Sequence, residues 1–258
     1  MDNTEFAHRM KMYEKRETRE KLNPNLPIVV RLDGRGFSKF TKPFKRPYDE
    51  DFREVMVATA KHVMENCGGC LAYTQSDEIS ILIDRSDVFF SGKKQKVVSV
   101  LAAMATSKFV IESMKKWPEH VSETTPHFDA RAFNVPDYNE AVNSIYWRQV
   151  DCVRNSVSMV GHYYLSRSDM HKKRRPEVIS MLKLRKDVDW YSYPNEFRYG
   201  VYVFRKTVNT PIEDEVWNKI PDKNKPESRV AQRNITVVKS FEDADFETIK
   251  NISLGVDV

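Results

Sequence analysis

The fold of this chain follows from one stretch, Ile28-Val29-Val30-Arg31-Leu32-Asp33-Gly34-Arg35-Gly36-Phe37-Ser38. It begins as an apolar, β-branched run after Pro27, which predicts a buried strand. The strand ends on the carboxylate of Asp33, and two glycines follow at once. Because glycines let backbone N–H groups approach a ligand closely, the stretch predicts a phosphate-binding loop beside a fixed carboxylate, which suits Mg²⁺ carrying a nucleoside triphosphate. An ordinary Asp-Gly turn is the alternative.

A second acidic turn lies downstream. Residues 71–83 predict two strands joined at Ser76-Asp77-Glu78, with isoleucines alternating along the second strand. If this hairpin pairs beside the first strand, Asp77 and Asp33 meet at one end of the sheet. Two carboxylates on neighbouring strands can hold two Mg²⁺ ions about 3.5–4 Å apart, the arrangement of a polymerase palm. A polar β-turn, in which Asp is common, is the alternative.

The order of the predicted elements gives the fold class. A strand at 28–33 is followed by a helix at 49–66, the hairpin at 71–83, a helix to about 117, a strand at 125–133 and a helix that opens at 136–137. This order is βαββαβ, a ferredoxin-like α+β sheet and the topology of polymerase palms and nucleotidyl cyclases. We therefore predict a palm-like catalytic domain over 1–165. A helical and hairpin C-terminal extension over 166–258, for RNA binding or oligomerisation, is predicted to pack on it.

Aromatic and basic residues mark the predicted extension. Residues 189–194 and 198–206 predict a hairpin rich in aromatics and arginine, which suits stacking on RNA bases, an ordinary sheet or a subunit interface. Residues 207–237 carry little pattern. The densest basic run is His171-Lys172-Lys173-Arg174-Arg175, in which Lys172, Lys173, Arg174 and Arg175 are the candidate RNA contacts. It predicts contacts with RNA phosphates, and an exposed basic loop is the alternative.

Four further polar residues are candidates for the site. Arg131, at the far end of its predicted strand, presents a planar guanidinium that suits a triphosphate. Arg148, Asp151 and Asn155 share one face of a predicted helix. They form either a structural ion pair or a substrate contact.

Composition narrows the class of protein. The chain has 258 residues, 40% of them hydrophobic, a net charge of +5 and a pI of about 8.9, which is compatible with a nucleic-acid partner. No apolar run approaches the ~18 residues of a membrane span, and the charged N-terminus has no signal-like segment, so we expect a cytoplasmic protein without a membrane partner. The Cys67-Gly68-Gly69-Cys70 pair lacks further zinc ligands at suitable spacing.

Three separated blocks carry a family resemblance. They are Arg31-Leu32-Asp33-Gly34-Arg35-Gly36-Phe37, Tyr73-Thr74-Gln75-Ser76-Asp77-Glu78, and Phe128-Asp129-Ala130-Arg131 with Trp147-Arg148-Gln149-Val150-Asp151-Cys152. In order and spacing they resemble the signature blocks of the tRNA-histidine guanylyltransferase family, from about residue 5 to 206. Members resemble polymerase palms and add nucleotides to the 5′ end of tRNA in the 3′-to-5′ direction. The resemblance implies two Mg²⁺ ions, GTP and ATP as substrates, tRNA as partner and a homotetramer.

The resemblance also assigns roles to residues. Asp33 and Asp77 are expected to bind both metal ions, with the carbonyl oxygen of Gly34 as a third ligand and Glu78 as a supporting catalytic residue. Nucleotide contacts are expected from the backbone after Asp33 and from scattered polar side chains: Gly34, Arg35, Gly36, Phe37, Ser38, Arg46, Ser76, Lys96, Arg131 and Asn155. Arg46 stands where the family usually has Lys.

One block departs from the family pattern. Eukaryotic members typically carry His-Ile-Asn-Asn after the Asp-Cys pair, and this chain has Val153-Arg154-Asn155-Ser156. The missing histidine points to the Thg1-like branch, which is associated with templated repair of tRNAs truncated at the 5′ end. Strict histidine-tRNA guanylylation remains an alternative. Two rivals from other classes are a nucleotidyl cyclase and a non-enzymatic RNA-binding module.

Overall fold

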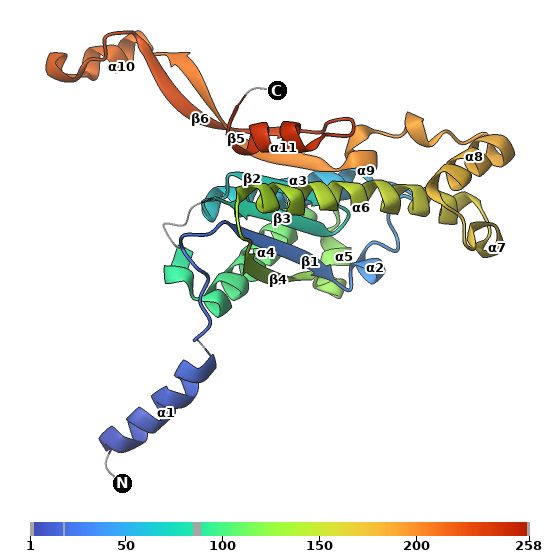
Figure 1. Ribbon diagram of the computed structural model, residues 1–258, viewed down its shortest axis with the longest axis horizontal. Helices are drawn as coiled ribbons and strands as arrows, with labels where there is room; N and C mark the ends of the chain where they lie inside the picture. Colours follow the sequence, from blue (N-terminus) through green and yellow to red (C-terminus); the bar gives the residue numbers. More distant parts are fainter. Residues whose placement is uncertain (1–2, 18, 85–88, 257–258) are drawn as a thin grey trace.

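One antiparallel sheet organises the molecule. The computed structural model describes residues 3–17, 19–84 and 89–256. Six strands pair in the order β4-β1-β3-β2-β5-β6 (Figure 1). Their bounds are β1 Ile28–Arg35, β2 Leu71–Gln75, β3 Glu78–Ile83, β4 His127–Asn134, β5 Val201–Pro211 and β6 Val230–Lys239. The predicted α+β class is confirmed.

Helices cover both faces of the central strands. On one face pack α3 (Glu50–Asn66) and α4 (Lys94–Lys116), and on the other α6 (Tyr138–Tyr164) and α11 (Phe246–Ser253). Every residue of β2 and β3 is buried as a result, which explains their nearly continuous apolar sequence. The remaining helices are α1 Asn3–Glu17, α2 Phe37–Phe40, α5 Pro118–Thr124, α7 Arg167–Met170, α8 Arg175–Lys186, α9 Asn195–Tyr199 and α10 Asp214–Lys219. Short 3₁₀ turns are η1 Phe89–Gly92, η2 Trp190–Ser192 and η3 Asp222–Asn224.

The predicted helices begin where their capping residues stand. Asp49 accepts a hydrogen bond from the amide of Phe52 at the start of α3, and Asp137 accepts one from Glu140 at the start of α6. Each cap satisfies an otherwise unpaired N–H of the first turn. The helices expected at 49–66 and from 137 onward are therefore confirmed.

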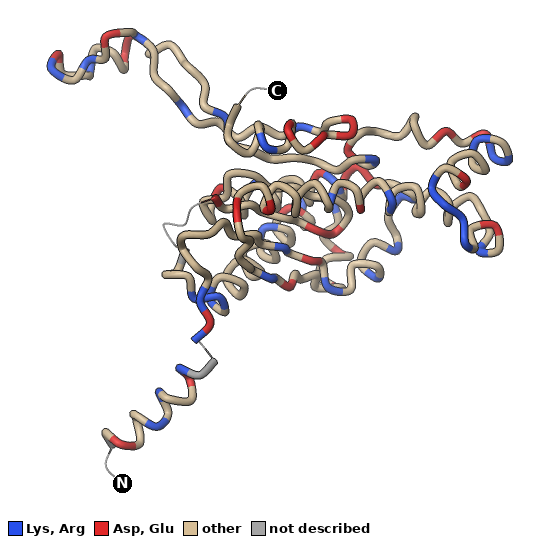
Figure 2. Tube along the Cα trace, in the orientation of Figure 1, with Lys and Arg blue, Asp and Glu red and all other residues tan. Residues whose placement is uncertain are grey.

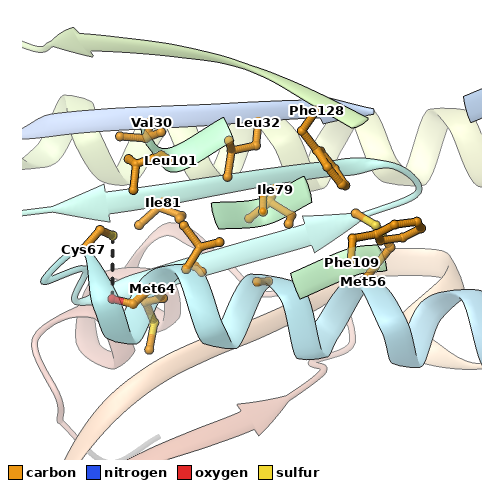
Figure 3. Packing of buried hydrophobic residues seen from close by; sticks show 14 of the residues in the cluster. Val30, Leu32, Met56, Met64, Cys67, Ile79, Ile81, Leu101, Phe109 and Phe128 are labelled. Carbon is orange, nitrogen blue, oxygen red and sulfur yellow. Dashed lines mark hydrogen bonds between the residues drawn. The ribbon is translucent and has the colours of Figure 1, made fainter. Parts of the chain in front are cut away.

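Aromatic and aliphatic side chains fill the layer between the sheet and α3–α4. Figure 3 shows Leu32, Met56, Phe109 and Phe128 converging there from β1, α3, α4 and β4. At the edge of this layer the Cys67 thiol donates to the carbonyl oxygen of Met64 at 3.7 Å. Burial raises the pKa of Cys67 to about 11. The thiol is therefore protonated at neutral pH and packs as a small apolar group.

Helix α4 is long and has an apolar composition. Among the described residues it is the one helix long and apolar enough to cross a membrane by length and composition. Core helices of globular proteins pass the same test. One face of α4, with Val97, Leu101, Ala105 and Phe109, is buried against the sheet and α3.

The predicted hairpin at 189–206 is wrong in its first half. Asp189 caps η2 by accepting from the amide of Tyr191 at 2.9 Å, and Pro194 precedes α9, so this segment turns helical. Strand β5 pairs instead with β2 on one side and on the other with β6, which comes from the stretch that had shown little pattern. Figure 1 shows this pair extending beyond the body of the protein, with α10 near its tip.

Candidate active site

Two carboxylates lie at the same end of the sheet, as the sequence predicted. Asp33 lies near the end of β1 and is paired in register with Glu78 of β3. The strand does not stop at Asp33 as expected, because Gly34 and Arg35 continue the pairing with β4. The amide of Gly34 donates to the carbonyl oxygen of Asp77 at 3.0 Å, which fixes the β2–β3 turn against β1. Ser76 reaches the turn with a positive φ of 50° and donates its hydroxyl to Asp77 Oδ1 at 3.1 Å.

The electrostatic environment of these carboxylates disfavours their charged forms. Burial raises the pKa of Asp33, and the charges of Glu78 and Asp129 raise it further. Burial also raises the pKa of Asp77, and the negative charges of Asp33 and Glu78 raise it further. The hydrogen bond from Ser76 lowers this pKa and so opposes the shift. A bound cation would remove this repulsion.

The two glycines after Asp33 serve different geometric needs. A Cβ on Gly34 would lie 2.5 Å from the ring of Phe37, so the backbone needs glycine to pass over that ring. Gly36 has a φ of +72° and begins α2. The side chain of Phe37 is buried in the core, so only its backbone is available to a nucleotide.

Glu78 is held by positively charged groups on both sides. Its Oε1 accepts from Arg31, and its Oε2 accepts from Arg148 of α6 and from Gln75 Nε2 at 2.8 Å. Arg148 also donates to Asp151 Oδ2 at 2.9 Å. The helix face predicted to carry Arg148 and Asp151 therefore forms an ion pair, and sequence reasoning missed that it reaches Glu78.

Two cavities adjoin Asp77. The first, which we call the aromatic cavity, has a volume of about 330 Å³ and is lined by Ser38, Thr41, Arg46, Ser76, Asp77, Asn155 and the rings of Phe44, Tyr48, Phe52 and Phe197. The second, the ion-pair cavity, has about 320 Å³ and is lined by Arg31, Gln75, Ser76, Asp77, Glu78, Arg148, Asp151, Asn155 and Ser158. Both volumes lie near the lower end of the range for small-molecule sites.

Arg46 and Asn155 lie at these cavities. Arg46 lines the aromatic cavity and donates to the carbonyl oxygen of Thr41 at 3.0 Å. Asn155 lines both cavities and donates to Asp151 Oδ2 at 3.2 Å. Arg35 and Arg131 are exposed on β1 and β4 and are not among the residues that line either cavity.

Lys96 lies at the other end of the sheet. Strand β3 runs away from the Asp77 turn, from Glu78 opposite Asp33 to Ile83 opposite Ile28. The chain then passes through η1, and α4 begins near that far end, where Lys96 is exposed and packs over the ring of Phe90 at 4.6 Å. Five steps along the strand separate the two ends by roughly 17 Å. The expected phosphate contact of Lys96 is therefore not made at the cavities beside Asp77, and it stays a prediction.

The basic run splits in the structure. Lys172, Lys173 and Arg175 line a third cavity of about 540 Å³, the basic cavity, between α6 and the α7–α8 segment. Arg174 instead precedes α8 as its N-terminal capping residue, and its amide donates to Glu177 at 2.9 Å. His171, the first residue of the run, lines this cavity too, as do Arg154, His162 and Arg167, which were missed because they are scattered along the sequence.

Comparison with known proteins identifies the family. A family model described as "Thg1: tRNAHis guanylyltransferase" matches residues 7–136, which include both Asp33 and Asp77. A solved structure of a bacterial tRNA(His) guanylyltransferase (Thg1)-like protein in complex with ATP superimposes with a TM-score of 0.72 and 34% identity, covering 77% of this chain and 88% of that one. A second bacterial Thg1-like structure, in complex with GTP, has a TM-score of 0.67 and 28% identity over 98% of this chain and 100% of that one.

A curated relative agrees with these matches. The tRNA(His) guanylyltransferase of Schizosaccharomyces pombe is 36% identical over 57% of this chain, and the match spans about half of that enzyme's length, 56%. The sheet, its carboxylate pair and the adjoining cavities thus define a nucleotidyltransferase. The chain belongs to the tRNA-histidine guanylyltransferase (Thg1) family.

Proposed function

We propose that this protein adds nucleotides to the 5′ end of tRNA in the 3′-to-5′ direction, with Mg²⁺, and that it repairs 5′-truncated tRNA by copying the opposing strand. The observation that carries the proposal is the pair Asp33 and Asp77, fixed at one sheet end by the Gly34–Asp77 hydrogen bond, with Asp77 lining both adjoining cavities. The bacterial relatives in complex with ATP and GTP support nucleoside triphosphates as substrates.

The donor atoms present fit Mg²⁺. Asp33, Asp77 and the Gly34 carbonyl supply hard oxygen ligands, the type that Mg²⁺ prefers. Both oxygens of Glu78 are occupied by Arg31 and Arg148, so this residue supports the turn and leaves the ligands to its neighbours. When bound, the ions activate the attacking hydroxyl and stabilise the leaving pyrophosphate.

The chain's own residues position the two substrates. Ser38, Ser76 and Arg46 line the aromatic cavity. In this proposal they hold a triphosphate there together with the backbone from Gly34 to Ser38. The tRNA 5′-phosphate is first activated, either as a pre-existing triphosphate or by ATP, which transfers AMP and releases pyrophosphate. The 3′-hydroxyl of the incoming nucleotide then attacks the 5′ phosphorus, and pyrophosphate or AMP leaves. Arg131, Lys96 and Asn155 are the further phosphate or RNA contacts of this proposal.

The topology supports a polymerase-like palm. Strands β1 to β4, with α3 between β1 and β2 and α4 between β3 and β4, follow the ferredoxin-like order of the elements. The same sheet continues into β5 and β6. We place the catalytic part at 1–165 and RNA binding or oligomerisation in 166–258, with a cytoplasmic homotetramer as the expected form.

The Thg1-like branch is supported by the surroundings of Val153. This side chain packs against an apolar cluster that contains Val157 and Trp190. Ser156, where the histidine branch has Asn, accepts from the Trp190 indole at 3.3 Å and is buried. Val153 cannot form a hydrogen bond with a base, and Ser156, which lines the aromatic cavity, has its hydroxyl bonded to Trp190.

One incorporation assay tests the function. Full-length and 5′-truncated tRNAs are incubated with each labelled NTP and Mg²⁺, and addition at the 5′ end of the truncated tRNA is expected. A cyclic nucleotide formed without tRNA would replace the proposal with a cyclase. Binding of tRNA without any incorporation would make the protein an RNA-binding module.

A further inference from the structure

The basic cavity is built almost entirely from cationic and apolar groups. Its wall on α6 is formed by Arg154, Val157, Ser158 and His162, and the α7–α8 side adds Arg167, Met170, His171, Lys172, Lys173, Arg175 and Val178. Among the described residues that line it, none is Asp or Glu. Figure 2 shows Lys and Arg gathered along the segment that joins α7 to α8.

Three of these cations lack a counter-charge. Lys173 pairs with Glu177 at 3.1 Å, and Arg154 pairs with Asp151. Within the described part of the chain, Arg167, Lys172 and Arg175 form no ion pair, although all three are exposed around one cavity. Like charges gathered without partners repel one another, so the cavity favours an anion.

Helix α6 connects this cavity to the candidate active site. Ser158 lines both the basic cavity and the ion-pair cavity that contains Asp77. Asp151, Asn155, Ser158 and His162 follow one another at helical spacing along one face of α6. The eleven residue steps from Asp151 to His162 span about 16 Å at ~1.5 Å per step.

We propose that the basic cavity binds backbone phosphates of the RNA strand whose 5′ end is extended, on the order of five nucleotides inward from that end. The count divides the ~16 Å along α6 by roughly 3.4 Å per nucleotide, the spacing along one strand of double-stranded DNA, which is used as the scale for a stacked RNA strand. The described lining contains no Phe, Tyr or Trp, and its exposed cations include three without an ion pair, so the cavity favours phosphates. This inference rests on the proposed function and adds a contact that sets how far the strand enters the site.

A combined protein and RNA substitution tests the contact. The probe is an acceptor-stem hairpin that lacks its first 5′ nucleotide and carries a single uncharged methylphosphonate at one chosen linkage. The test variant is Arg167→Gln/Lys172→Gln/Arg175→Gln, which removes the unpaired cations from exposed positions and leaves no core cavity. The matched control is Lys61→Gln/Lys115→Gln/Lys186→Gln, which removes the same charge from exposed positions outside the basic cavity.

The expected results concern salt dependence and position. The test variant should lower the slope of log affinity against log salt by up to ~0.9 per lost contact, or about two to three units, whereas the control should keep the wild-type slope. Neutralising a linkage roughly three to seven nucleotides from the 5′ end should weaken binding by wild type and by the control but not by the test variant.

Each contrary result removes a defined part of the argument. An unchanged salt slope in the test variant, or equal sensitivity of all three proteins at every linkage, would overturn the phosphate contact. Competition by ATP, lost in the test variant but kept in the control, would reassign the cavity to free nucleotides. RNA binding is measured here without catalysis. If the incorporation assay fails but the effect of the neutral linkage still depends on the three cations, the proposed activity is wrong and the phosphate contact remains.

Discussion

Arg148 of α6 reaches across to Glu78 of β3 and holds it in a buried ion pair. Arg148 is 5% exposed and Glu78 is 8% exposed. Arg148 also donates to Asp151 at 2.9 Å and packs over the ring of Trp147 at 4.7 Å. The pair joins the helix that borders all three cavities to the residue directly after Asp77.

Replacing Arg148 should therefore destabilise the protein strongly. Arg148→Met keeps the apolar stem but removes the guanidinium that pairs with Glu78 Oε2 and Asp151 Oδ2. We expect this to lower the free energy of unfolding by about 3–5 kcal/mol. Urea unfolding followed by far-UV circular dichroism measures it. The control is Arg154→Gln, whose exposed ion pair with Asp151 should be worth no more than about 1 kcal/mol. An equal decrease in the free energy of unfolding in the two variants would show that the buried Arg148 ion pair contributes no more to stability than the exposed one.

Asp33→Ala and Asp77→Ala should each abolish nucleotide addition in a folded protein. Both side chains are only partly buried, so truncation opens no core cavity, while loss of a metal ligand removes several kcal/mol of charge stabilisation. Activity is measured by incorporation at saturating Mg²⁺, and folding by circular dichroism. Glu123→Ala, which removes an exposed carboxylate of α5, should keep wild-type activity. Unaltered incorporation by either Asp variant would refute its place as a ligand.

The raised pKa of Asp77 predicts how pH and Mg²⁺ act on stability. A carboxyl group whose pKa is higher in the folded than in the unfolded protein stabilises the fold when protonated, below the ordinary value of 3.8. That contribution is lost as the pH rises through the raised pKa. At neutral pH without metal, Asp77→Asn should therefore have a higher Tm than wild type.

Added Mg²⁺ should reverse this order. Binding to the folded wild type raises its Tm in proportion to RT ln(1 + [Mg²⁺]/Kd), whereas Asp77→Asn lacks a ligand and should gain little. The measurement is thermal unfolding at pH 7 in chelator and then across a Mg²⁺ titration. A wild-type Tm above that of Asp77→Asn in chelator would contradict the electrostatic account of this turn.

The local parts of the fold were predictable from sequence, and the long-range parts were not. Strand β1, the β2–β3 turn and the caps of α3 and α6 depend on residues adjacent in the chain, so periodicity and capping signals locate them. The pairing of β5 with β6 crosses the whole segment that holds α10 and η3, and the mostly exposed residues of β6 show no alternation that would predict a strand.

The same distinction holds for the candidate site. The proximity of Asp33 and Asp77 was predictable, because a hairpin that pairs beside the first strand places its turn at that strand's end. The ion pair between Glu78 and Arg148 was not, because it joins residues 70 positions apart. The place of Lys96 depends on the direction in which β3 leaves the turn. The basic cavity combines parts of α6 and α7–α8 that no sequence motif links.

The last prediction concerns how the nucleotide is chosen. Val153 stands where the histidine branch has His, and its side chain can neither donate nor accept a hydrogen bond. Because Val153 packs into an apolar cluster and Ser156 is bonded to Trp190, base choice should depend on Watson–Crick pairing with the opposing strand. A tRNA that lacks its first 5′ nucleotide should therefore receive the base that pairs with the opposing residue.

Changing the opposing base should change the incorporated nucleotide. The measurement is incorporation of each of the four NTPs into truncated tRNAs that differ only at the templating position, with Val153→His as the comparison variant. Wild type should follow the template in all cases. Val153→His restores a hydrogen-bonding side chain on this half-buried turn of α6, and it tests whether that side chain brings a preference for guanosine that is independent of the template. If the wild-type protein adds guanosine whatever the opposing base, and only to histidine tRNA, then the residues around Val153 do not set template dependence and the protein is a guanylyltransferase of the histidine branch.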